Sequence, residues 1–147
     1  MLAVVDPGVV VAGLLAPGEQ SATVLRLWMS GAFDLVVCPR WLAELDATLS
    51  RPALRSRITI DETVELLDLL RSDARIHDDP AGVPVAQGRR PDAAYLVILA
   101  AATRAALVSA DRNLLELRQH VPVHTPGEFV QLAEALEGSP RQSSAIR

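Results

Sequence analysis

The sequence predicts an α/β fold: a single domain with a mostly parallel central sheet flanked by helices. Its 147 residues are enough for one domain with a substantial core. Half of the residues are apolar, and only 3% are aromatic, a composition that suits buried strands under helices. Short apolar runs alternate with stretches of helical periodicity along the chain, and this alternation is typical of a parallel sheet.

The apolar runs predict strands, at residues 2–5, 33–38, 74–77, 105–108 and 121–124. Helical patterns and capping signals predict helices, at residues 9–15, 19–30, 39–49, 61–73, 92–103, 113–118 and 126–136. Residues 54–60 are ambiguous, and residues 78–91 are expected to form a long loop because they hold three prolines and two glycines. The predicted domain covers residues 1–137, and the polar tail at 138–147 is expected to be disordered.

Three details of this assignment concern the core. The helix at 92–103 is apolar nearly all round, so we expect it to be buried. On the helix at 61–73, Val64 is expected on the apolar side. Trp28, Trp41 and Cys38 are expected to be core residues, although a reactive thiol at Cys38 is the alternative.

The composition excludes several classes of protein. All fourteen basic residues are arginine, so a phosphate-binding P-loop and lysine Schiff-base chemistry are excluded. A single cysteine excludes an intrachain disulfide and a cysteine-cluster zinc site. The net charge of −4 argues mildly against nucleic-acid binding. No apolar run is long enough to span a membrane and no signal peptide is apparent, so a cytoplasmic protein is expected.

Four carboxylates stand where this fold would bring them to one edge of the sheet: Asp6, Glu44, Asp92 and Asp111. Asp6 and Asp111 follow apolar strand runs, and ligands bind beyond the carboxyl ends of parallel strands. Clustered like charges need a cation, and carboxylate oxygens favour Mg²⁺ or Mn²⁺. The alternative is structural, because Asp6, Asp92 and Asp111 each also fit a helix N-cap.

Glu44 has no such structural explanation, because it lies inside a helix and caps nothing. It flanks one side of the apolar stripe of its helix, and Asp46 flanks the other. Periodicity alone does not choose between the two acids, and the usual interpretation of either is a solvent-exposed side chain on the helix surface.

Seven short motifs follow one another along residues 2–136: Val4-Val5-Asp6, Val36-Val37-Cys38-Pro39, Trp41-Leu42-Ala43-Glu44, Arg51-Pro52, Pro91-Asp92, Leu107-Val108-Ser109-Ala110-Asp111 and Val123-His124-Thr125-Pro126. This ordered set resembles the PIN-domain family of metal-dependent ribonucleases, in particular its VapC-like toxin branch.

The resemblance implies that Asp6, Glu44, Asp92 and Asp111 are the catalytic and metal-binding residues, and it selects Glu44 over Asp46. Ser109 and Asn113 would not bind the metal directly but would lie next to these ligands and support them. The side chains that would contact the RNA backbone are Arg40, Arg89, Arg90 and Arg112.

The implied function is a Mg²⁺- or Mn²⁺-dependent endoribonuclease that hydrolyses RNA phosphodiesters with a metal-activated water. It would be a toxin held by a small antitoxin, and a homodimer. Departures from the family pattern, Pro7-Gly8 after the first Asp and Asn113 in place of another acid, support an alternative: a catalytically weakened domain that binds RNA or protein. A phosphatase or phospho-receiver is a third reading, although the chain lacks the second Asp and the lysine those enzymes need.

Overall fold

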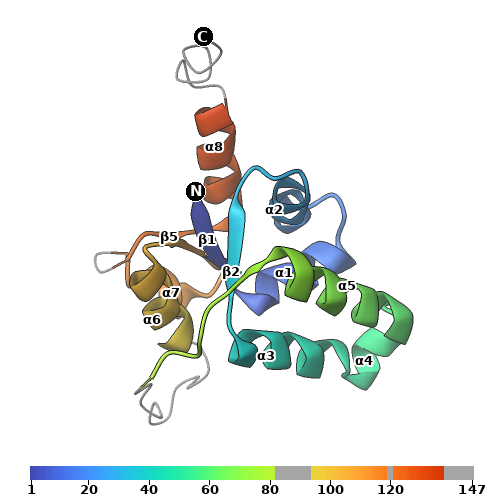
Figure 1. Cartoon of the computed structure of the whole chain (residues 1–147). Coiled ribbons are helices and arrows are strands. Elements are labelled where there is room, and N and C mark those ends of the chain that lie inside the picture. The colour runs from blue at the N-terminus through green and yellow to red at the C-terminus, as the bar shows by residue number, and fades with distance from the viewer. Residues whose placement is uncertain (82–93, 119–120, 138–147) are drawn as a thin grey trace.

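The chain folds around a five-stranded, all-parallel sheet, shown in the computed structural model of Figure 1. The structure describes residues 1–81, 94–118 and 121–137. The strand order is β3-β2-β1-β4-β5, so β1 lies in the middle. The strands are β1 (Leu2–Val5), β2 (Asp34–Val37), β3 (Arg75–Ile76), β4 (Ala106–Val108) and β5 (Val123–His124). The expected α/β fold with a parallel sheet is confirmed.

Helices flank the sheet on both sides. In Figure 1, α1 to α5 lie on one side of the strands, and α6 and α7 lie on the other. The helices are α1 (Pro7–Leu15), α2 (Gln20–Met29), α3 (Pro39–Leu49), α4 (Pro52–Arg55), α5 (Ile60–Asp73), α6 (Ala94–Thr103), α7 (Arg112–Leu115) and α8 (Pro126–Glu137). The ambiguous stretch at 54–60 therefore contains the end of the short helix α4, which begins with a proline.

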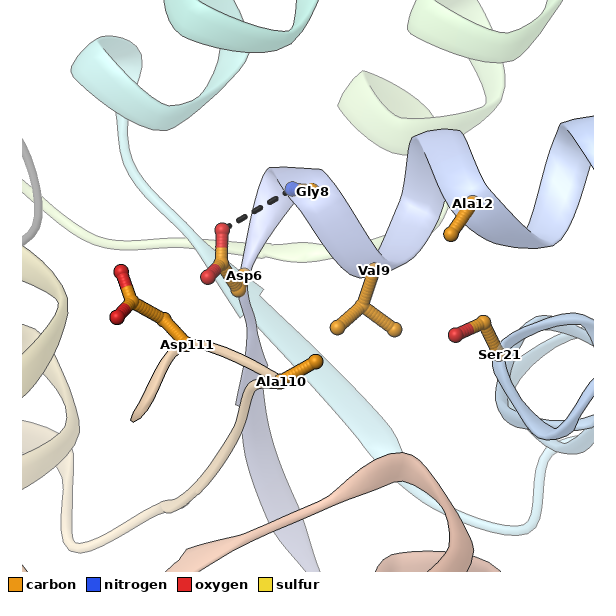
Figure 2. Close-up of a pocket in the computed structure, with 7 residues that line it drawn as sticks. All are labelled: Asp6, Gly8, Val9, Ala12, Ser21, Ala110 and Asp111. Carbon is orange, nitrogen blue, oxygen red and sulfur yellow. Dashed lines mark hydrogen bonds between the residues drawn. The ribbon is translucent and has the colours of Figure 1, made fainter. Parts of the chain in front are cut away.

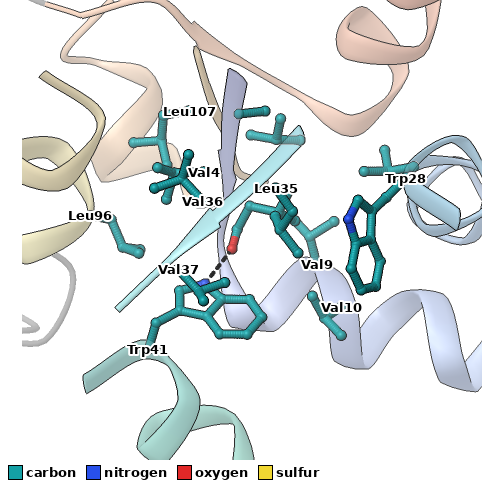
Figure 3. Packing of buried hydrophobic residues seen from close by; sticks show 14 of the residues in the cluster. Val4, Val9, Val10, Trp28, Leu35, Val36, Val37, Trp41, Leu96 and Leu107 are labelled. Carbon is teal, nitrogen blue, oxygen red and sulfur yellow. Dashed lines mark hydrogen bonds between the residues drawn. The ribbon is translucent and has the colours of Figure 1, made fainter. Parts of the chain in front are cut away.

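The core is built from the apolar strands and the inner faces of the helices (Figure 3). Trp41 is fully buried, and its indole Nε1 donates a 2.6 Å hydrogen bond to the carbonyl of Val5 at the end of β1. Trp28 and Cys38 are also buried, as expected. At Gly13 of α1, a Cβ would lie 2.8 Å from the Ser21 carbonyl, so glycine allows α1 and α2 to approach this closely.

Two expectations about burial need correction. The helix α6 is not buried all round, because Ala101 and Ala102 are exposed and only one face packs against β1 and β4. Val64 is 50% exposed, so it lies off the apolar side of α5, which is made by Leu66, Leu67 and Leu70. The expected tail at 138–147 and most of the expected loop lie outside the described residues.

Within the described ranges, no single helix combines the length and the apolar composition needed to cross a membrane. The helices α1 and α2 would pass this test only together, and they are bent by 103° at their junction.

The helices α2 and α6 end in turns of the same type, but the residue with a positive φ is a glycine in one and an arginine in the other. After α2, Gly31 has a positive φ of 83°, and the next N–H, from Ala32, bonds the Leu27 carbonyl at 2.9 Å. After α6, Arg104 has a φ of 55°, and the N–H of Ala105 bonds the Ala100 carbonyl at 2.9 Å. Both are Schellman-type ends, in which the left-handed residue is usually glycine because a Cβ is strained there.

We therefore predict that Arg104→Gly stabilises the protein by roughly 0.5–1 kcal/mol, because relief of the left-handed strain outweighs the added freedom of the unfolded chain. Arg104 is exposed, so little packing is lost. Urea unfolding followed by circular dichroism measures the change. The matched control, Gly31→Ala, should lower the free energy of unfolding by a similar amount, and destabilisation by Arg104→Gly would contradict the prediction.

Candidate active site at the carboxyl ends of the central strands

The candidate site lies at the middle strand, β1, where the order in which strands are added to the sheet reverses. The strands β2 and β3 extend the sheet on one side of β1, and β4 and β5 extend it on the other. The crevice outside the carboxyl ends of such a pair of central strands is the usual ligand site of a parallel sheet. Asp6 follows the last residue of β1, and Ser109, Ala110 and Asp111 follow the last residue of β4.

The Asp6 side chain is held from two directions. Its Oδ1 accepts the backbone N–H of Gly8 at 3.0 Å, so Asp6 caps the N-terminus of α1 (Figure 2). Its Oδ2 accepts the hydroxyl of Ser109 at 2.8 Å. Asp6 is only 8% exposed, and the positive end of the α1 dipole favours its negative charge. Because each carboxylate oxygen has two acceptor positions, these bonds leave Asp6 able to bind a cation.

Ser109 connects Asp6 to Asp111. The Ser109 side chain is fully buried, and while its hydroxyl donates to Asp6 it also accepts the backbone N–H of Asp111 at 3.0 Å. The Asp111 Oδ1 in turn accepts the backbone N–H of Asn113 at 2.9 Å, which makes Asp111 the N-cap of α7. This unbroken series of hydrogen bonds fixes both carboxylates relative to the two strand ends.

Asp6 and Asp111 both line one cavity of about 290 Å³, and Figure 2 shows the two acids at one end of the set of lining residues. The other residues around it are Gly8, Val9, Ala12, Ser21 and Ala110. Asn113 contributes only its backbone N–H among the contacts described above, and its side chain is exposed. Pro7 and Gly8, which follow Asp6, form the first turn of α1 and carry no polar side chain.

Glu44 and Asp46 occupy very different positions. Glu44 is half-buried on α3, and its Oε2 accepts the hydroxyl of Tyr95 from α6 at 2.5 Å. Asp46 is exposed and its nearby partner is Ser50, on the same helix. Glu44 is therefore bonded to α6, whereas Asp46 is not, but among the described residues Glu44 does not join Asp6 and Asp111 in a group of three acids close enough to hold an ion.

Of the arginines expected near the site, two are described. The guanidinium of Arg40 lies over the ring of Tyr95, 4.6 Å from its centroid, and the Arg40 backbone N–H donates to Asp79 at 2.8 Å. Arg112 is exposed in the first turn of α7, next to Asp111. The predictions for Asp92, Arg89 and Arg90 fall outside the described residues.

Burial and negative charge shift two pKa values near this edge. Burial, the hydrogen bond to Glu44 and the charges of Glu44, Cys38 and Asp6 raise the pKa of the Tyr95 phenol far above its usual range. Burial, assisted by Asp79, raises the pKa of the Cys38 thiol to about 11, so this thiol stays protonated and unreactive at neutral pH.

The residues present fit a hard divalent cation. Asp6 and Asp111 line one cavity, and Mg²⁺ is commonly bound by one or two carboxylates, with water and substrate phosphate completing its shell. Among residues 1–81, 94–118 and 121–137, no three His, Cys, Asp or Glu side chains gather closely enough to hold an ion alone. A site formed by this pair would therefore rely on ligands beyond those described.

Sequence reasoning missed Tyr95. It is the only tyrosine of the chain and stands on an otherwise apolar helix. That single phenol was the available signal, because a buried Tyr hydroxyl needs a hydrogen-bond partner. The identity of its partner on α3 depends on tertiary contact across 51 residues, which no local pattern contains.

Comparison with known proteins identifies the family of the chain. The sequence matches the model of the PIN domain family over residues 3–113, about three quarters of the chain, which confirms the resemblance seen in the sequence. Members of this family are generally nucleases. No curated protein matches the chain at a significant level.

Several solved structures share the fold at low sequence identity. The structure of VapBC2 from Rickettsia felis, bound to a DNA fragment from its promoter, aligns with a TM-score of 0.57 and 15% identity over 85% of this chain and 98% of that chain. PAE2754 from Pyrobaculum aerophilum aligns with a TM-score of 0.64 and 17% identity, covering 92% and 90%. A PilT N-terminus domain protein, SSO1118 from Sulfolobus solfataricus, gives 0.53 and 14%, covering 90% and 93%.

We predict that Ser109→Ala lowers the free energy of unfolding by about 1–3 kcal/mol, because the Asp111 N–H and the Asp6 carboxylate lose a buried partner. Denaturant unfolding of both proteins measures the loss. Ser72→Ala is the control: its hydroxyl bonds exposed Asp73, and the change should stay within about 0.5 kcal/mol. Equal effects of the two substitutions would show that Ser109 does not hold the two strand ends together.

Proposed function

The chain belongs to the PIN domain family, and we propose that it is a Mg²⁺- or Mn²⁺-dependent endoribonuclease that acts in the cytoplasm as the toxin of a toxin–antitoxin pair. One observation carries the proposal. Asp6 and Asp111 line a common cavity outside the carboxyl ends of β1 and β4, and the same hydroxyl, from Ser109, bonds both segments.

In this proposal Asp6 and Asp111 hold the ion directly, with Asp92 as a further ligand. Glu44 binds a second ion or orients the attacking water. When bound, the ion would lower the pKa of a water molecule and neutralise charge that develops on the scissile phosphate.

The protein's own residues then determine how the RNA lies. Arg40 lies over Tyr95 and Arg112 is next to Asp111, and we assign both arginines contacts to the RNA backbone. Arg89 and Arg90 are proposed for the same role. Single-stranded RNA loops are the proposed target, because their phosphates and bases are accessible. Since the net charge is −4, binding relies on these local arginines rather than on the whole surface.

The partner proposals rest on the family and on one structural neighbour. The Rickettsia felis structure is of a VapBC complex with promoter DNA, which supports a small DNA-binding antitoxin as the partner of this chain. We also propose that the chain forms a homodimer, as the resemblance implies. Light scattering of the purified chain, alone and with the product of a neighbouring short gene, measures both assemblies.

The test is metal-dependent cleavage of a structured RNA pool, with a matched DNA pool to examine substrate class. Asp6→Asn and Asp111→Asn should each lower the rate about 100-fold or more, which corresponds to roughly 2.7 kcal/mol of transition-state stabilisation. Asparagine is as good an N-cap as aspartate, so these substitutions remove the charge while keeping the helix caps.

Asp46→Asn is the control, since Asp46 is an exposed acid on the same helix as Glu44. We expect it to retain the wild-type rate within about twofold, because exposed substitutions away from a site have little effect, while Glu44→Gln loses most of it. Folded, metal-loaded protein that cleaves neither pool would instead favour the alternative function, an RNA- or protein-binding module weakened by Pro7-Gly8.

A further inference from the structure

A buried tyrosine connects the helix that carries Glu44 to the far side of the sheet. Tyr95 is fully buried on α6, and its hydroxyl donates the 2.5 Å bond to Glu44 Oε2 on α3. The two helices follow different strands and lie on opposite sides of the sheet in Figure 1. The Tyr95–Glu44 hydrogen bond therefore crosses the edge of the sheet that is formed by the carboxyl ends of the strands, where Asp6 also lies.

The surroundings of Tyr95 fix its ring. Arg40 covers one face of the ring at 4.6 Å from the centroid, and the Arg40 backbone is itself held by the side chain of Asp79. Leu96 and Leu99, the neighbours of Tyr95 on α6, are buried in the core. A ring held in this way presents its hydroxyl at a fixed place.

A hydrogen-bond donor held in a fixed place restricts the orientation of a flexible carboxylate that accepts its bond. Glutamate has three rotatable side-chain bonds, so binding an ion costs it conformational entropy. A hydrogen bond to a carboxylate is also stronger than one between neutral groups. Since Glu44 caps no helix, its hydrogen bond to Tyr95 is not explained by local structure, whereas the bonds of Asp6 and Asp111 are partly explained by capping.

From this geometry we infer that Tyr95 is a positioning residue, which holds the Glu44 carboxylate in the orientation that the metal site requires. The inference rests on the proposed function in the form in which Glu44 binds an ion, and it adds one residue to that site. Tyr95 does not touch the ion or the RNA, and it acts through Glu44.

The test measures Mn²⁺ binding by calorimetry, without RNA, so that it does not depend on turnover. Tyr95→Phe keeps the ring and its packing and removes only the hydroxyl. We expect its Mn²⁺ affinity to fall about tenfold, the usual effect of removing a group that orients a metal ligand. In cleavage assays the metal concentration for half-maximal rate should rise by a similar factor, while KM for RNA stays unchanged.

A double-substitution cycle separates positioning from a general loss of structure. In a Glu44→Gln background, adding Tyr95→Phe should change Mn²⁺ affinity less than about twofold, because the residue through which Tyr95 acts has lost its charge. An equal tenfold loss in both backgrounds would show that Tyr95 acts on the fold and would overturn the inference.

The remaining outcomes distinguish this inference from the proposed function. Wild-type protein that binds Mn²⁺ while Tyr95→Phe binds it equally well would overturn the inference and leave the nuclease proposal intact. Wild-type protein that binds neither Mn²⁺ nor Mg²⁺ would overturn both.

Discussion

The parallel pairing of β1 with β4 is the constraint on which the rest of the site depends. The register places Val5 opposite Val108, and the N–H of Asp6 continues the ladder by bonding the Val108 carbonyl at 2.9 Å. Asp6 and Ser109 are therefore brought to the same height at the edge of the sheet, where their side chains bond each other. A shift of one residue in this register would turn every side chain of β4 to the other face and separate the pair.

The indole of Trp41 extends this constraint to the third acid. Its bond to the Val5 carbonyl fixes the end of β1 against α3, one turn before Glu44 on the same helix (Figure 3).

Helix capping and ligand binding by the same carboxylate are compatible at this edge of the sheet, because each carboxylate has two oxygens. Donors from α1, α7 and Ser109 stabilise two neighbouring carboxylates, and helix N-termini supply the positive potential that such charges need.

Sequence patterns predicted the parts that depend on local chemistry. Apolar runs placed all five strands within two residues of their ends, and Thr125 and Glu128 form a capping box at the start of α8 that their spacing also indicates. Sequence patterns failed where a tertiary contact determines the surroundings of a side chain. Periodicity left Glu44 and Asp46 equivalent, and in the structure the bond from Tyr95 on α6 and the partial burial of Glu44 distinguish them. Val64 was placed on the wrong side because the packed stripe of α5 is narrower than its apolar composition suggests.

The location of a bound ion tests the central claim most directly. Crystals of the chain soaked in Mn²⁺, with diffraction measured at the manganese absorption edge, would show whether the cavity outside β1 and β4 binds a cation. We predict an anomalous peak between the carboxylates of Asp6 and Asp111 that disappears in Asp111→Asn. Ordered crystals with no peak there, or with manganese only at other surface acids, would contradict the assignment of this edge as the metal site of the nuclease.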